Sequence, residues 1–99
     1  MAVLNVALEE GFTDDAVVVA VDGRTVFDRT GVRTRTQIGL AESFEVEVDE
    51  GRSVVDIQVP ARDAHGRLEV PVAATTFVGV SLQGGDVVFR SSGEPFGYL

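Results

Sequence analysis

The stretch VVVAVDGRTVF, residues 17–27, decides the fold class of this chain. A half-buried strand alternates apolar and polar residues, whereas residues 17–21 are apolar without a break, which indicates a strand covered on both faces. The Asp22-Gly23 pair that follows is typical of a type I′ turn, because both central positions of that turn need positive φ. The stretch therefore predicts a β-hairpin that carries apolar side chains on each face.

Pairing across this turn predicts which side chains share a face. It sets Val19 opposite Val26 on one face, which we take as the core, and Val18 opposite Phe27 on the other. Keeping a large apolar side chain from water is worth about 1.5–3 kcal/mol, so Val18 and Phe27 are expected to be covered. The cover could come from the chain's own tail or residues 28–42, from a second copy, or from a different protein.

Strand patterns recur along the rest of the chain. Alternation bounded by turn residues is frequent, and no stretch of a dozen residues shows a helical apolar stripe. We expect a first strand over residues 3–9, a short edge strand near 32–36, an edge strand over 67–72, and further hairpins through residues 49–52 and 83–85. The pattern predicts one all-β domain over residues 1–99, an antiparallel β-sandwich of about seven or eight strands, immunoglobulin-like or prealbumin-like.

The hairpin expected through residues 49–52 contains a candidate for a metal site. On its outer face Glu45 is predicted to lie directly opposite Asp56, and such like charges cost stability unless a cation or an arginine neutralises them. Carboxylates can bind a hard cation such as calcium through oxygen alone. A solvated acidic face is the alternative.

Composition narrows the classes of partner. The net charge is −8, all eight basic residues are arginines, and cysteine is absent. This balance argues against binding a nucleic-acid backbone or an anionic membrane, and the missing cysteine excludes disulfides and thiolate metal sites. The segment MAVLNVALEE lacks the regions of a signal peptide, which favours a cytoplasmic protein or a domain of a larger one.

Residues for catalysis or ligand binding are few. The one histidine, His65, lies in the polar stretch RDAHGR, where a solvated side chain is the simplest interpretation. No GxSxG elbow and no phosphate-binding glycine loop is present. A sugar platform could come only from Phe12, Phe96 and Tyr98, the aromatic residues outside the predicted strands. We expect no enzyme, no cofactor and no small ligand.

The segments VVVAVDGRTVFD and SFEVEVDEGRSVVDIQV, within residues 16–82, resemble PEGA-type and carboxypeptidase-regulatory-like β-sandwich modules. In those modules an Asp/Asn-Gly hairpin is followed by a loop and by a second hairpin with a glycine in its turn. The resemblance implies a non-catalytic accessory or interaction module.

We therefore expect a module that acts through protein–protein contact, either as a homodimer or by accessory binding. Val18 and Phe27 are expected at the centre of the contact, with Phe96 and Tyr98 nearby. The alternative function is a calcium-assisted or carbohydrate-binding module that uses the acidic outer face around Glu45.

Overall fold

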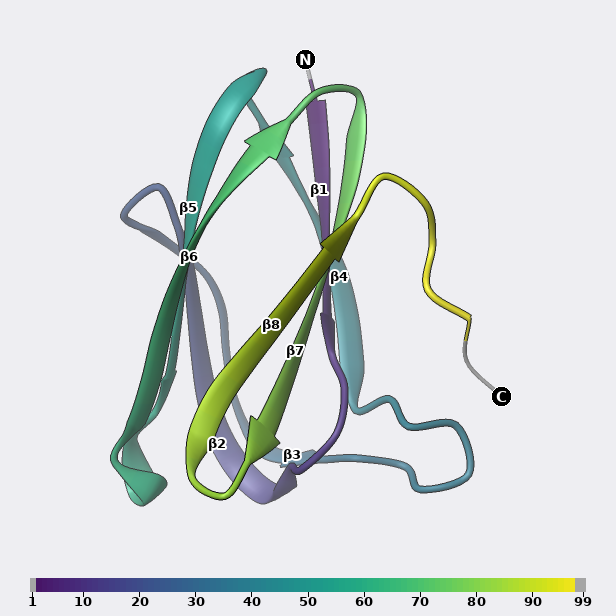
Figure 1. Ribbon diagram of the computed structural model, residues 1–99. Helices are drawn as coiled ribbons and strands as arrows, with labels where there is room; N and C mark the ends of the chain where they lie inside the picture. The colour runs from purple at the N-terminus through teal and green to yellow at the C-terminus, as the bar shows by residue number, and fades with distance from the viewer. Residues whose placement is uncertain (1, 98–99) are drawn as a thin grey trace.

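The computed structural model describes residues 2–97 and consists of two packed four-stranded sheets (Figure 1). One sheet has the order β4-β1-β7-β8 and the other the order β3-β2-β5-β6. All strand pairs are antiparallel except β1 with β7. The elements are β1 (Ala2–Leu8), β2 (Thr13–Val21), β3 (Arg24–Arg33), β4 (Glu42–Val48), β5 (Gly51–Val59), the 3-10 helix η1 (Pro60–Arg62), β6 (Ala64–Val72), β7 (Thr75–Gln83) and β8 (Asp86–Ser92). The predicted small β-sandwich is confirmed.

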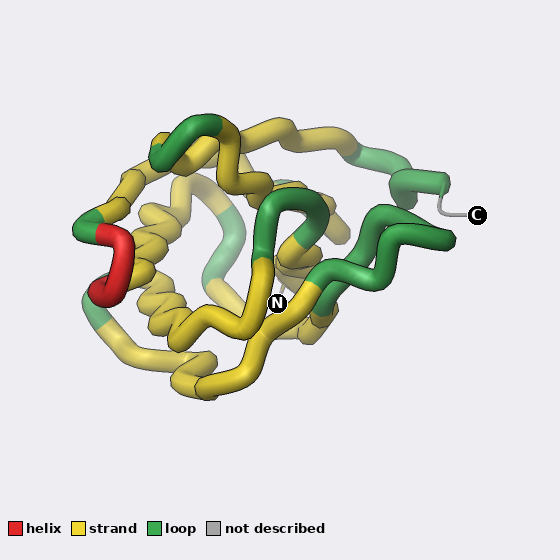
Figure 2. Tube along the Cα trace, turned by 90° about the horizontal axis from the view of Figure 1, so that it is seen from below, coloured by secondary structure: helices red, strands yellow, loops and turns green. Residues whose placement is uncertain are grey.

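The core lies between the two sheets, which surround it when the molecule is seen from below (Figure 2). Alternation along each strand points every second side chain inward. In β2 these are Val17, Val19 and Val21, each at most 3% exposed. The inward side chains of β1, β5 and β7 are likewise buried: Leu4, Val6, Leu8, Val55, Ile57, Val59, Val78, Val80 and Leu82. Burial of this apolar surface is the main source of stability in a chain without cysteine.

The first hairpin has the predicted turn but a different register beyond it. Ala20 pairs with Thr25 close to the turn, and a β-bulge then places Val19 opposite Phe27. The extra residue, Val26, shifts the alternation by one and turns Phe27 toward the core, where it is 7% exposed. The predicted pairing of Val19 with Val26 and the predicted outward position of Phe27 are therefore wrong. The prediction paired residues one to one across the turn, and it therefore could not include the extra residue that a bulge inserts in one strand.

The hairpin predicted through residues 49–52 does not form. β4 pairs with β1 in one sheet, and β5 pairs with β2 and β6 in the other, so the turn at 49–50 carries the chain between layers. Glu45 consequently lies opposite Asn5, while Asp56 lies between Ala20 and Arg67. The predicted pairing of Glu45 with Asp56 is wrong. Alternation along β4 is compatible with pairing to any strand that alternates in the same way, so it does not identify the neighbouring strand.

Two other predictions of secondary structure are confirmed. β7 and β8 form a hairpin through Gly84-Gly85, and β6, which contains Pro71, is an edge strand. The edge strand expected near residues 32–36 is only the end of the longer β3, followed by a turn that an isolated bridge between Arg35 and Leu40 closes. None of the helices in the described part of the chain is long and apolar enough to cross a membrane.

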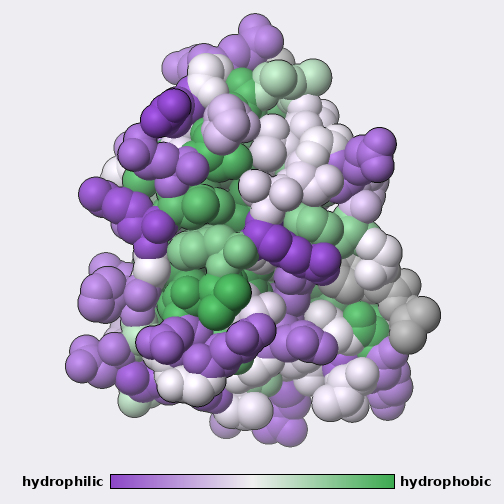
Figure 3. All heavy atoms as spheres, in the orientation of Figure 1, coloured by the Kyte–Doolittle hydropathy of each residue, from purple (hydrophilic) through white to green (hydrophobic). Residues whose placement is uncertain are grey.

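Direct packing of β6 against β8 closes one edge of the sandwich. A Cβ atom at Gly66 would lie 2.9 Å from the Val87 Cβ atom and 3.0 Å from a ring carbon of Phe89, so the absence of a side chain there allows the strands to approach. Val87, Phe89 and Leu68 are half-buried and pack against the core. Apolar side chains accordingly gather between β6 and β8 in the space-filling view (Figure 3).

An ion pair with a buried carboxylate fixes η1 to β2. The Asp15 side chain is 7% exposed and accepts hydrogen bonds from Arg62 Nε and Nη2 at 2.8 and 2.9 Å and from the Thr13 backbone N–H at 2.8 Å. Burial by itself raises the pKa of Asp15, but the bonds from Arg62 and Thr13 and the arginine charge outweigh it. The pKa of Asp15 is therefore below its ordinary value.

This arrangement predicts that Asp15→Asn destabilises the protein in a pH-dependent way. Since the pKa of Asp15 is lower in the folded state than in the unfolded state, its stabilising effect is fully present above about pH 4 and is lost as the pH falls through the folded pKa. We expect urea unfolding to show a loss of about 1–3 kcal/mol at pH 7 that shrinks at pH 3. Asp28→Asn, at an exposed position of β3, serves as the control. A loss at pH 3 as large as at pH 7 would contradict the prediction.

Candidate interaction edge

The structure separates the residues that were predicted to form one contact surface. Val18 lies on the outer face of β2, half-buried, whereas Phe27 lies in the core. Phe96 lies over β8 of the other sheet, with its ring centroid 3.9 Å from the Arg90 Cζ atom. Tyr98 is outside the described residues. Whether Val18 takes part in a contact stays a prediction, but it has neither Phe27 nor Phe96 beside it.

The candidates for ligand binding are also dispersed. Glu45 and Asp56 lie in different sheets, and Asp56 accepts a hydrogen bond from Arg67 Nε at 2.9 Å. Within residues 2–97 no group of three or more acidic or histidine side chains could hold a metal ion. Phe12 is 1% exposed, so its ring is part of the core and cannot serve as a sugar platform. His65 is exposed on β6, opposite Gln58.

The edge opposite β6 and β8 is formed by β3 and β4, and we call it the β3–β4 edge. Each strand has one strand neighbour, β2 for β3 and β1 for β4. The Phe27 and Phe44 rings stack across this edge, with centroids 4.9 Å apart and an interplanar angle of 11°. Beside them Arg29 Nη1 lies 3.6 Å from Glu42 Oε1, and the Arg29 Cζ atom lies 5.4 Å from the Phe27 ring centroid.

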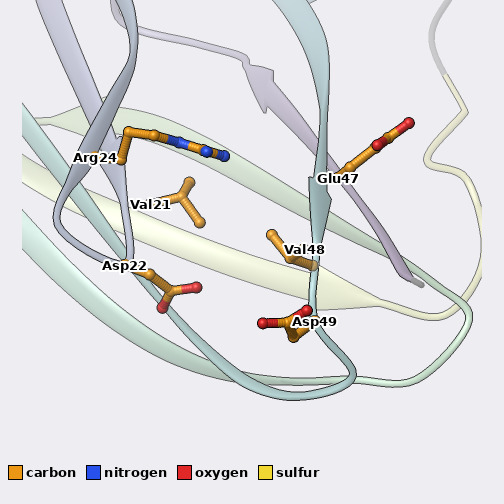
Figure 4. A pocket seen from close by; sticks show the side chains of 6 residues that line it. All are labelled: Val21, Asp22, Arg24, Glu47, Val48 and Asp49. Carbon is orange, nitrogen blue, oxygen red and sulfur yellow. The ribbon is translucent and has the colours of Figure 1, made fainter.

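A groove of about 500 Å³ continues this edge toward the turns (Figure 4). Val21 and Val48 face each other across it, and the guanidinium of Arg24 extends over it from the β3 side. The carboxylates of Asp22 and Asp49 point toward each other at its far end. Asp22 is held there because its Oδ1 atom accepts a hydrogen bond from the Val54 backbone N–H at 2.8 Å. The remaining lining residue is Glu47 of β4.

Charge divides sharply between the two strands of the edge. β3 carries three arginines against the single Asp28, which makes it net +2. Residues 42–50, which comprise β4 and its turn, carry five acidic residues and no basic one, which makes them net −5. A basic strand and an acidic strand therefore face each other across the open edge of an acidic protein.

Sequence reasoning missed this edge because it paired β4 with β5. The available signal was compositional: arginine gathers in residues 24–35, and acidic residues gather in 42–50. Only the tertiary structure shows that these segments are neighbours. Comparison with family models, curated proteins and solved structures gives no match for this chain. The resemblance to PEGA-type and carboxypeptidase-regulatory-like modules thus stays a prediction.

Proposed function

We propose that the protein is a non-catalytic module that acts through protein–protein contact, and that the β3–β4 edge is its contact surface. The supporting observation is the difference between the two edges of the sandwich. At the β6–β8 edge the strands pack directly on each other, whereas β3 and β4 meet mainly through their side chains. Unpaired N–H and C=O groups along an edge strand are a template for pairing with another chain.

The side chains of the β3–β4 edge suit such a role. Phe44 is half-buried at its centre and provides an aromatic anchor, while charged residues form the rim. The Arg29 and Glu42 side chains are 65% and 38% exposed, so a pair of this kind contributes little to the stability of the monomer. Charges placed in this way act mainly on the rate and the specificity of association.

The proposal predicts that reversing the charge of β3 disrupts association. We expect Arg24→Glu combined with Arg29→Glu to weaken binding at least about tenfold, because like charges then face any partner that complements this strand. The measurements are the solution molar mass and the retention of other proteins on the immobilised chain, with melting temperatures to verify folding.

Arg52→Glu is a matched control. Arg52 is exposed, and its Nη1 atom lies 3.5 Å from Glu69 Oε1 in the β5–β6 part of the molecule, away from the β3–β4 edge. We expect this control to associate as the unmodified chain does. A chain that stays at 10.5 kDa at every concentration, and that retains the same proteins with and without the two β3 substitutions, would overturn the proposal.

A further inference from the structure

We infer that the partner of the β3–β4 edge is a second copy of this chain, placed so that β3 of each copy lies beside β4 of the other. This inference rests on the proposed function and names the partner. It starts from the order of side chains along the two strands. Arg29 is level with Glu42, and Phe27 is level with Phe44.

The numbering rises along β3 as it falls along β4, so the two strands run in opposite directions. A twofold axis parallel to the strands, just outside β3 and β4 and midway between the planes of the two sheets, exchanges the two layers of the sandwich. It places β4 of the second copy in the plane of β3 of the first, at the same level and in antiparallel orientation. Each free strand edge then meets a free strand edge of the other copy.

Charge is complementary where the structure sets the level of the two strands. Arg29 faces Glu42 of the second copy, so the ion pair within one chain has a counterpart between two chains. Phe27 and Phe44 lie two residues further along the strands, so an aromatic pair is flanked by this ion pair. Because a twofold contact is isologous, each of these pairings occurs twice. The complementarity seen within one chain is therefore reproduced between two chains.

The resulting assembly extends both sheets. The order β6-β5-β2-β3 continues into β4-β1-β7-β8 of the second copy, and the same happens in the other layer. Each sheet then has eight strands, which is within the usual limit of about ten for open sheets. The free edges of β3 and β4 are paired in both layers, while β6 and β8 remain the edge strands of the joined sheets. The outer faces of the joined sheets lie on the same side.

The other simple twofold arrangement has its axis perpendicular to the strands, and charge disfavours it. That arrangement pairs β3 with β3 and β4 with β4, which opposes arginines with arginines and glutamates with glutamates. Like charges directly opposite each other in a sheet are destabilising. The distribution of arginine and glutamate therefore selects the arrangement that joins β3 to β4.

The first test uses sedimentation equilibrium on charge variants over a range of concentrations. We expect the unmodified chain to approach twice its mass of 10.5 kDa as concentration rises, and association to weaken in high salt. The variant with Arg24→Glu and Arg29→Glu should dissociate, with a dissociation constant higher on the order of 100-fold. Adding Glu42→Arg and Glu47→Arg to the same chain should restore the dimer, because β3 and β4 then again carry net charges of opposite sign.

The second test is disulfide trapping, which is clean because the chain has no cysteine. Asp28 and Ser43 are exposed on the outer faces of different sheets, so Asp28→Cys and Ser43→Cys cannot bond within one chain. In the inferred dimer they become neighbours across the new strand pair. We expect oxidation to link chains that carry both substitutions, and also a mixture of the two single variants.

The outcomes separate this inference from the proposed function. A chain that stays monomeric, yet binds another protein in a way that the two β3 substitutions abolish, would overturn the inference and leave the proposed function standing. Efficient linking of Asp28→Cys chains alone, or a fourfold charge variant that stays monomeric, would overturn the arrangement of β3 beside β4. Arg52→Glu should leave the dimer unchanged.

Discussion

Phe27→Arg is expected to lower the free energy of unfolding by about 3–5 kcal/mol, a large part of the stability of a domain of this size. The Phe27 ring is 7% exposed and stacks on Phe44, so the substitution removes buried aromatic contact. It also places a second guanidinium near Arg29, at a position where the side chain is largely shielded from water. Urea unfolding followed by circular dichroism measures the loss.

Val18→Arg is the matched control, because the simple hairpin register places Val18 and Phe27 on the same outer face. In the structure the bulge at Val26 separates them, and Val18 stays half-buried on the outside of β2. We expect Val18→Arg to cost less than about 1 kcal/mol, since a long side chain can reach water from there. Equal tolerance of both substitutions would mean that the bulge is absent and that Phe27 faces outward.

Gly11→Ala is expected to be similarly severe, with a loss of more than about 3 kcal/mol. Gly11 has φ of +93°, and an added Cβ atom would lie 2.0 Å from the backbone oxygen of Leu82. The neighbouring Glu10 carbonyl accepts a hydrogen bond from the Leu82 N–H at 2.8 Å, so the chain here is held tightly against β7. Relieving the clash requires breaking this connection between the first loop and β7.

Gly23→Ala separates the two causes of that loss. Gly23 has a comparable φ of +83°, but a Cβ atom there would meet nothing within 4 Å. We expect Gly23→Ala to lower the free energy of unfolding by only roughly 1–2 kcal/mol, which is the cost of a left-handed backbone conformation for a residue with a Cβ atom. Thermal unfolding of both variants under the same conditions provides the comparison. Equal losses would show that the close approach to Leu82 does not matter.

Local patterns were sufficient for most of the strands and for two of the hairpins. The turns at Asp22-Gly23 and Gly84-Gly85 need positive φ, and this requirement is visible in the residues themselves. The end of β5 also has a local cause, because Pro60 follows it directly and proline cannot donate to a ladder. The core side of β2, which carries Val19, followed from alternation alone.

The candidate site could not be predicted in this way. Alternation defines which side chains share a face of a strand, but it carries no information about which strand lies beside it. The predicted site therefore joined Glu45 to Asp56 and Val18 to Phe27, and the structure separates both pairs. The stack of Phe27 on Phe44 joins residues whose strands lie in different sheets.

By itself, the sequence determined the all-β class, the positions of the strands and the absence of disulfides, because these depend on local conformation and composition. Only the tertiary structure decided the bulge at Val26, the pairing of β4 with β1 and the meeting of a basic strand with an acidic one. The physical reason is that strand pairing forms between distant segments, where many registers satisfy the same alternation. Packing of the whole core selects one of them.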